Sequence, residues 1–268
     1  MRLKVLCIGD VVGSPGRRAL AQELHGLVTQ HDIACTIVNG ENIASGSGIT
    51  PPLFEKLLKS GTNLVTLGDH IYRRKEIIPL LETSERVVRP ANLASGAPGR
   101  EFALYETAAG PRVAVISLLG RLYMKTPTDC PFRAVERVLG KLPSDVHIVV
   151  VDMHAEATSE KIAMGWFLDG RISLLYGTHT HVPTADERVL PGGTGYITDL
   201  GMTGPYDSVL GRDKSAVLQS MVTSVPVRFD VADDDVRICG VIAEINSESG
   251  RCVHVERIQH RVQISPGS

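Results

Sequence analysis

The sequence has little of what marks secreted, membrane-spanning or nucleic-acid-binding chains. Its 268 residues include only five cysteines, which are scattered without a C-x-x-C pair; this excludes a disulfide framework and indicates reduced thiols. No apolar run approaches the roughly 20 residues that a membrane-spanning helix needs, and the N-terminal stretch enters a strand without a signal-peptide pattern. A net charge of −2 offers no positive field to recruit nucleic acid. We therefore expect a cytoplasmic protein with a small-molecule substrate, and neither a membrane nor a long nucleic acid as a stable partner.

The composition that is present, 43% hydrophobic and 22% charged, is that of a globular chain with a sizeable core. Short apolar runs alternate with helical patterns over the first two thirds of the chain. We expect strands at 3–9, 34–40, 63–68, 145–152 and 171–177, helices at 15–31, 50–61, 74–84, 131–142 and 159–170, and a hairpin formed by 101–107 and 111–120. From about 187 onward we expect a largely β region, with two strands in 236–259. This order predicts an α/β fold with a mixed sheet, and without repeats or a clear linker we expect one domain over 1–268.

Polar side chains follow five of the expected strands at the point where each strand ends. In open α/β sheets, sites form outside the carboxyl ends of the strands. Carboxylate and imidazole groups suit Mn, Fe or Zn, and two ions that share a bridging carboxylate can hold a phosphoryl group and activate water. The candidate residues are Asp10, Glu41, Asn42, Asp69, His70, His154, His179 and His181.

Each candidate has an ordinary structural explanation when it is taken alone. Asp10 could cap the following helix, Glu41 could belong to a turn, and His70 could be a loop histidine. His179 and His181 stand one residue apart, so an extended segment would turn both rings to the same side. Because five strand ends carry such residues, we favour a dinuclear metal site. A rival interpretation, dinucleotide binding by residues 9–16, fits poorly because the spacing is G-x-x-x-G-x-x-G instead of G-x-G-x-x-G.

The motifs GD, GEN, LGDH, MHAEATSEK, GTHTHVPTAD and TDLGMTGPYDS resemble, in this order, the YmdB-like branch of the calcineurin-type metallophosphoesterases. The resemblance runs from residue 9 to about 211. It implies a four-layer αββα sandwich in which two mixed β-sheets are flanked by helices. It also implies two metal ions per chain, iron or manganese.

The resemblance further implies a role for each candidate. The first metal would be held by Asp10, Asn42 and His181. The second would be held by Asp69, His154 and His179, and Glu41 would bridge the two. Family members hydrolyse phosphodiesters, notably 2′,3′- and 3′,5′-cyclic nucleotides, through a metal-bridged hydroxide, and His70 resembles the histidine that protonates the leaving oxygen.

Two further features concern the substrate side of the site. The family usually has asparagine where this chain has Asp69, and we expect the added charge to favour a more highly charged metal pair and to blunt its Lewis acidity. Tyr72 could stack on a base and Arg73 could attract a phosphate. A half-buried aromatic residue and a solvated helix face explain these two about as well.

Two classes of function remain open. The first is a small-nucleotide phosphodiesterase or a related phosphoesterase, including a phosphomonoesterase. The second is a weakly active regulatory or nucleotide-binding protein that retains the metal site. The presence of His70 and of a full ligand set favours the first class. We also expect a homo-oligomer, whose size the sequence does not define.

Overall fold

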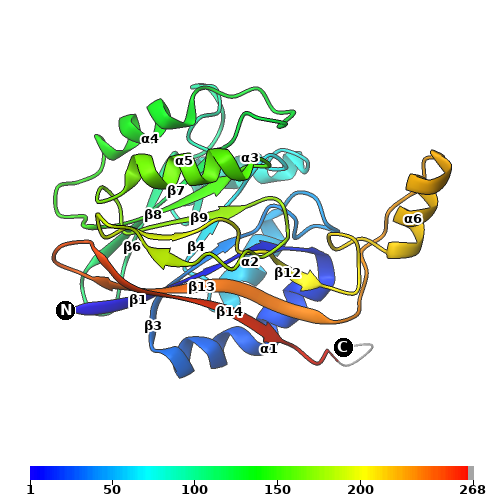
Figure 1. Cartoon of the computed structure of the whole chain (residues 1–268), viewed down its shortest axis with the longest axis horizontal. Helices are drawn as coiled ribbons and strands as arrows, with labels where there is room; N and C mark the ends of the chain where they lie inside the picture. Colours follow the sequence, from blue (N-terminus) through cyan, green and yellow to red (C-terminus); the bar gives the residue numbers. More distant parts are fainter. Residues whose placement is uncertain (265–268) are drawn as a thin grey trace.

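The computed structural model describes residues 1–264, and in it two β-sheets face each other with helices on both outer faces (Figure 1). This is the four-layer arrangement of mixed sheets and flanking helices predicted from the sequence. Within residues 1–264, no helix is both long enough and apolar enough to cross a membrane.

The first sheet has eight strands, seven of them in the order β2-β12-β13-β1-β3-β4-β5, while β14 pairs with β13. Neighbours from β1 to β5 run parallel, whereas β13 runs antiparallel to β1, β12 and β14. The strands are β1 (Arg2–Ile8), β2 (Asp10–Val11), β3 (Ile33–Asn39), β4 (Leu64–Thr66), β5 (Val87–Val88), β12 (Met202–Pro205), β13 (Val236–Asn246) and β14 (Cys252–Arg261).

The second sheet has six strands in the order β10-β11-β9-β8-β7-β6. Its four central strands are parallel, and β6 and β10 close the two edges as antiparallel strands. The expected hairpin is confirmed, because β6 pairs antiparallel with β7. The strands are β6 (Phe102–Glu106), β7 (Arg112–Leu119), β8 (Ile148–His154), β9 (Leu174–Thr178), β10 (Arg188–Val189) and β11 (Gly195–Ile197).

Alternating side chains of the strands build separate apolar layers. In β1, Val5 and Cys7 join the core between the sheets, whereas Leu6 and Ile8 join the core beneath α1 and α2. A third layer packs α4 and α5 against the second sheet. The helices are α1 (Gly13–His31), α2 (Pro51–Lys59), α3 (Ile78–Thr83) with the 3₁₀ turn η1 (Lys75–Ile77) before it, α4 (Pro131–Leu139), α5 (Thr158–Leu168) and α6 (Lys214–Thr223).

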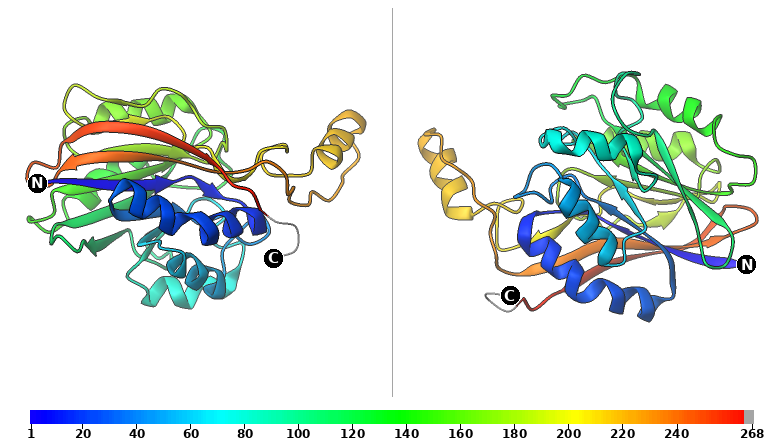
Figure 2. Two further views of the ribbon diagram at one scale, coloured as in Figure 1. Left: turned by 90° about the horizontal axis from the view of Figure 1, so that it is seen from below. Right: turned by 180° about the vertical axis from the view of Figure 1, so that it is seen from behind.

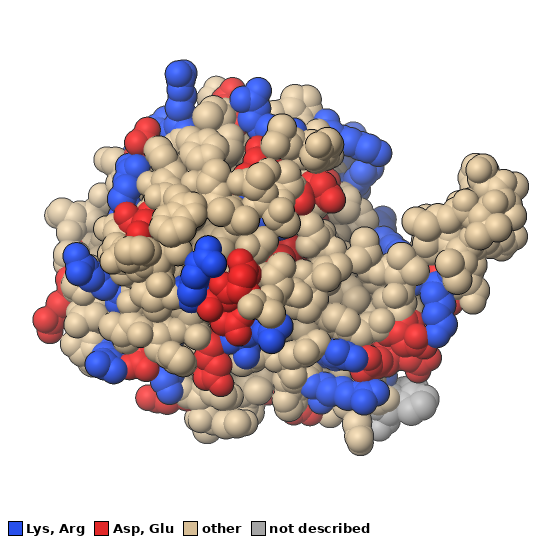
Figure 3. All heavy atoms as spheres, viewed as in Figure 1, with Lys and Arg blue, Asp and Glu red and all other residues tan. Residues whose placement is uncertain are grey.

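After residue 187 the described chain is largely β, as expected, with the five strands β10 to β14, but it also contains the helix α6, which was not predicted. This helix projects from the body of the molecule (Figure 2), and the space-filling view shows few charges on it (Figure 3). Leu218, Met221 and Val222 are exposed on it. Only one side chain of this helix, Val217, is buried, and its amphipathic pattern is weak, so the period by which helices are recognised is not evident there.

Candidate metal centre

The polar residues at the strand ends meet at one edge, where the two sheets face each other. The first sheet supplies a residue of β2 and the turns that follow β3 and β4, and the second supplies the last residue of β8 and the loop after β9. A continuous set of contacts shorter than 4 Å joins all eight candidates: Asp10, Glu41, Asn42, Asp69, His70, His154, His179 and His181. The structure therefore brings together every residue proposed as a metal ligand, together with His70.

The densest part of the centre contains four residues with ligand atoms within 4.8 Å of one another: Glu41, Asp69, His154 and His179. His154 Nε2 lies 3.1 Å from Asp69 Oδ1 and 3.3 Å from Glu41 Oε1. His179 Nδ1 lies 3.1 Å from His154 Nε2 and 3.4 Å from Asp69 Oδ1. Two ring nitrogens and two carboxylates thus face a common centre.

A second group lies beside it and is connected through Glu41. Asn42 Nδ2 lies 3.0 Å from Glu41 Oε1, 3.1 Å from His181 Nε2 and 3.4 Å from Asp10 Oδ1. His181 Nε2 is also 3.8 Å from Asp10 Oδ1. Glu41 thus contacts both groups, and the assignment of each group to one metal ion stays a prediction.

Each of the three imidazoles in the two groups has its outer ring nitrogen beside an acceptor. His154 Nδ1 lies 2.8 Å from Thr178 Oγ1, and His181 Nδ1 lies 3.1 Å from the carbonyl oxygen of Leu210. His179 Nε2 lies 3.3 Å from Glu156 Oε2. Because histidines that bind metals usually donate their other N–H to such an acceptor, all three rings are oriented as ligands would be.

Thr178 also defines the tautomer of His154. Its hydroxyl donates to Asp152 Oδ1 at 2.6 Å, so its oxygen must accept the proton on His154 Nδ1. Asp152 is buried and also accepts hydrogen bonds from Thr66 and Asn39. Burial raises the pKa of Asp152 to about 6.

The backbone of the two-histidine loop differs from the sequence-based expectation. β9 ends at Thr178, so His179 and His181 lie beyond the strand, and both have positive φ angles of 92° and 66°. The alternation of an extended segment is therefore the wrong reason for their convergence. The left-handed backbone costs energy for residues other than glycine, and it directs the two rings to the two different groups.

A buried ion pair anchors the loop that contains His179 and His181. Between the two histidines, the hydroxyl of Thr180 donates to Asp199 Oδ2 at 2.7 Å. Asp199 in turn pairs with Lys161 of α5 at 2.6 Å, and both side chains are at most 1% exposed. The pair thus fixes the segment that positions the two rings.

The electrostatics and the space at the centre fit a bound cation. Burial opposes ionisation of Glu41 and Asp69, but the neighbouring histidines hold the pKa of each carboxyl below its usual range. Burial likewise opposes protonation of His154, yet Glu41 and Asp69 raise its pKa. A Cβ at Gly68 would collide with Glu41 and His154, so only glycine leaves this space open. Oxygen and nitrogen donors around such a space are the ligands that Mn, Fe or Zn prefer.

His70 lies at the outer side of the centre, with 26% of its side chain exposed. Its Nδ1 is 2.8 Å from Asn42 Oδ1 and 3.3 Å from Glu41 Oε1, while its Nε2 is 3.8 Å from Asp69 Oδ2. Burial lowers the pKa of this imidazole, but the hydrogen bond and charge of Glu41, together with Asp69, outweigh the effect and raise it.

The structure also bears on the alternatives left open above. The N-cap of α1 is Val12 and not Asp10. Asp10 Oδ2 instead accepts a hydrogen bond from the backbone N–H of His179. The Tyr72 hydroxyl donates to the carbonyl of Pro98, and its ring packs against the core. Arg73 is exposed. A contact of Tyr72 or Arg73 with substrate stays a prediction.

The sheets and the cluster at their edge define the class of the protein, a calcineurin-like metallophosphoesterase sandwich. Residues 6–258 match the sequence pattern of YmdB-like proteins. The chain therefore belongs to the YmdB-like family.

Similar proteins agree with this placement. The chain is 43% identical over 256 residues to a Bacillus subtilis (strain 168) protein named 2′,3′-cyclic-nucleotide 2′-phosphodiesterase, with 96% of each chain covered. A crystal structure of a hypothetical protein from Thermus thermophilus is 40% identical, with a TM-score of 0.89 over 97% of this chain and 99% of that one. That of a Mycoplasma pneumoniae phosphatase is 30% identical, with a TM-score of 0.90 over 97% and 94%.

Proposed function

We propose that the chain is a phosphodiesterase that hydrolyses small cyclic nucleotides, 2′,3′ or 3′,5′, with two metal ions held by the residues of the candidate centre. The observation that carries the proposal is the orientation of His154, His179 and His181. Each has its outer nitrogen beside an acceptor and its inner nitrogen directed at the carboxylates and amide of the centre. The name of the Bacillus subtilis relative supports the choice of a cyclic nucleotide.

Asp10, Asn42 and His181 would hold one ion, Asp69, His154 and His179 the other, and Glu41 would join them. Iron or manganese suits this donor set. Bound there, two metal ions would neutralise phosphoryl charge and lower the pKa of a water to near neutrality.

His70 would donate a proton to the leaving ribose oxygen. Its Nδ1 is directed at Asn42 and Glu41, and this leaves Nε2 as the nitrogen that can meet a substrate. An alkoxide leaves poorly unless it is protonated, so this transfer is worth roughly 10²–10⁴-fold in rate. Glu41 also accepts the backbone N–H of His70 at 3.1 Å, which fixes the imidazole beside the centre.

Metal analysis together with hydrolysis of two diesters tests the proposal. 2′,3′-cAMP has an alkoxide leaving group, whereas bis-p-nitrophenyl phosphate releases a phenolate that needs little protonation. We expect about two metal ions per chain, and we expect His70→Ala to retain them. Turnover of 2′,3′-cAMP should fall roughly 10²–10⁴-fold in this variant, and that of bis-p-nitrophenyl phosphate far less.

The matched control is His254→Ala, which removes an exposed histidine of β14 and should leave metal content and both rates unchanged. Equal losses on the two diesters would show that His70 is not the acid. Bound metal without turnover of any diester would indicate the nucleotide-binding protein instead. Faster hydrolysis of p-nitrophenyl phosphate than of either diester would indicate a phosphomonoesterase.

A further inference from the structure

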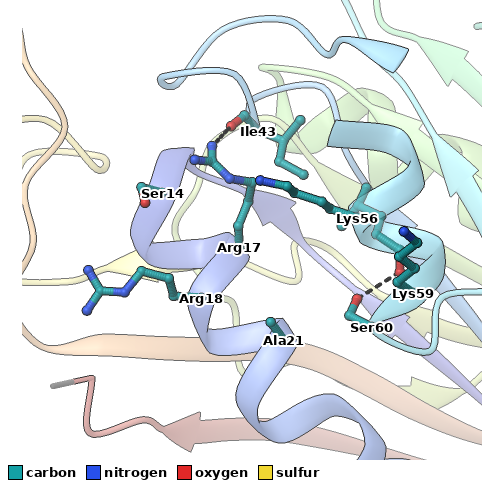
Figure 4. A pocket seen from close by; sticks show the side chains of 9 residues that line it. Ser14, Arg17, Arg18, Ala21, Ile43, Lys56, Lys59 and Ser60 are labelled. Carbon is teal, nitrogen blue, oxygen red and sulfur yellow. Dashed lines mark hydrogen bonds between the residues drawn. The ribbon is translucent and has the colours of Figure 1, made fainter. Parts of the chain in front are cut away.

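A cavity of about 430 Å³ lies between α1 and α2, on the outer face of the first sheet (Figure 4). Its walls include the apolar side chains of Ile43 and Leu57. Its polar lining consists of Ser14, Arg17, Arg18, Lys56, Lys59 and Ser60. Within residues 1–264, none of the residues of the metal centre lines this cavity, so it is a separate site.

Among residues 1–264, the charged side chains that line the cavity are all basic. Of the described residues, four basic ones line it and no acidic one does, although acidic residues outnumber basic ones in the whole chain, 30 to 28. Among residues 1–264, Arg17, Lys56 and Lys59 have no carboxylate partner within 4 Å. In Figure 4 the side chain of Lys56 extends from α2 toward Arg17 on α1. Both side chains line the cavity, so an anion bound there would be attracted by more than one positive charge.

Arg17 is partly buried beside the cavity. Partial burial lowers the pKa of its guanidinium, and its NH1 donates to the carbonyl oxygen of Ile43 at 2.6 Å. This neutral acceptor fixes the side chain but leaves its charge uncompensated. The guanidinium thus borders the cavity in a position set by the fold.

The helix end beside the cavity has the same sign. α1 begins at Gly13 without an acidic residue in its first turn and without a side-chain cap. The positive end of the helix dipole is therefore not neutralised at Ser14, which lines the cavity. Helix N-termini with nearby basic side chains favour phosphate groups.

From the cavity, its basic lining and the helix end, we propose that this site binds a small anion with more than one phosphate charge, of the pyrophosphate or nucleoside-diphosphate class. The cavity volume lies within the roughly 300–1,000 Å³ range of small-molecule sites. The inference goes beyond the proposed function and does not depend on it.

The site also touches the back of the loop that carries two residues of the metal centre. Arg17 holds the carbonyl of Ile43, and the backbone N–H of Gly13 donates to the carbonyl of Asn42 at 3.0 Å. Ile43 lines the cavity and directly follows the segment Glu41–Asn42. An anion bound between α1 and α2 would therefore lie behind this segment.

Calorimetric titration with inorganic pyrophosphate tests the proposal. The probe is added to the metal-loaded protein and, in parallel, to the protein after chelation, since pyrophosphate also binds metals. We expect binding that persists after chelation and that Lys56→Glu weakens at least tenfold. Lys56 is exposed, so the reversal of its charge should not disturb the fold.

The matched control is Arg133→Glu, which reverses an exposed charge on α4, on the opposite face of the molecule. It should leave pyrophosphate binding unchanged. Equal weakening by the two variants would overturn the proposal, because net charge alone would then explain the binding. Loss of all binding on chelation would overturn it as well. A parallel titration with ADP distinguishes the two ligands. If ADP binds more tightly than pyrophosphate, the site is assigned to a nucleoside diphosphate. If the two bind equally, the site is assigned to free pyrophosphate.

Discussion

Thr178 donates its hydroxyl to Asp152 across 2.6 Å in the interior of the second sheet, and the same hydroxyl oxygen accepts from His154. The Asp152 carboxylate is thus connected to the His154 imidazole through the hydroxyl group of Thr178. The arrangement fixes the orientation of the ring and makes Nε2 the nitrogen available to a metal.

We predict that Asp152→Asn weakens metal binding by about 10–100-fold, as losses of such outer partners usually do. An amide cannot accept from Thr66, Thr178 and Asn39 together, so the chain of hydrogen bonds to His154 would be broken. Competition with a chelator of known affinity measures the change. The control Asp233→Asn, at an exposed position, should bind metal as the unmodified protein does. If the metal affinity of Asp152→Asn were unchanged, Asp152 would have no role in orienting His154 as a ligand.

The raised pKa of His154 predicts how the stability of the metal-free protein depends on pH. A histidine whose pKa is raised on folding stabilises the fold fully below its unfolded value of about 6.5, and the contribution is lost as pH rises through the folded value. After chelation, the free energy of unfolding should therefore fall as pH increases above about 6.5.

Urea unfolding of the chelated protein across this pH range measures the effect. His154→Gln should reduce it and leave the contribution of His70, whose pKa is also raised. In the same range metal affinity should rise with pH, because metal and proton compete for the imidazole. A metal affinity independent of pH would contradict this interpretation.

Asp69 contacts both His154 and His179. The family resemblance implies an asparagine at this position, so the charge of Asp69 is the expected difference. We predict that Asp69→Asn weakens metal binding by at least about tenfold, as a loss of about 1.4 kcal/mol would give. Its turnover when fully loaded with metal should be faster, because one less negative charge leaves the metals stronger Lewis acids. Metal titration and saturated rates on bis-p-nitrophenyl phosphate separate the two effects. If both quantities matched those of the unmodified protein, Asp69 would have no special role.

The buried pair Lys161–Asp199 predicts a large effect on stability. Lys161→Met leaves Asp199 without its cation in the interior, and the free energy of unfolding should fall by about 3–5 kcal/mol. Urea denaturation checks this value. The control is Lys141→Met, which removes an exposed pair with Glu101 and should cost no more than about 1 kcal/mol. Similar losses in the two variants would show that burial of the Lys161 pair carries no special weight.

The sequence predicts the candidate ligands of the centre better than it predicts the groups that orient these ligands. Asp10, Glu41 and Asp69 could be found because polar residues at the ends of successive strands must meet at one edge of the sandwich. Glu156 gave no such signal, since one carboxylate on a loop looks like any solvated side chain. The partner of His181 is the carbonyl of Leu210, and a backbone group carries no sequence signal.

Most strands and helices were predictable because apolar periodicity indicates burial, whereas the two-sheet sandwich was implied by the family resemblance. The backbone of the two-histidine loop was not predictable, since positive φ is uncommon for residues other than glycine and a histidine adopts it too seldom to indicate it. The helix α6 was also not predicted, because its short sequence has only a weak amphipathic pattern.

The candidate centre draws on both sheets. The first sheet contributes Asp10, Glu41, Asn42 and Asp69, and the second contributes His154, His179 and His181. During folding, neither sheet alone can assemble the centre, because the two sheets must first pack face to face. Metal uptake should therefore be a late event, and its rate during refolding would time the docking of the two halves.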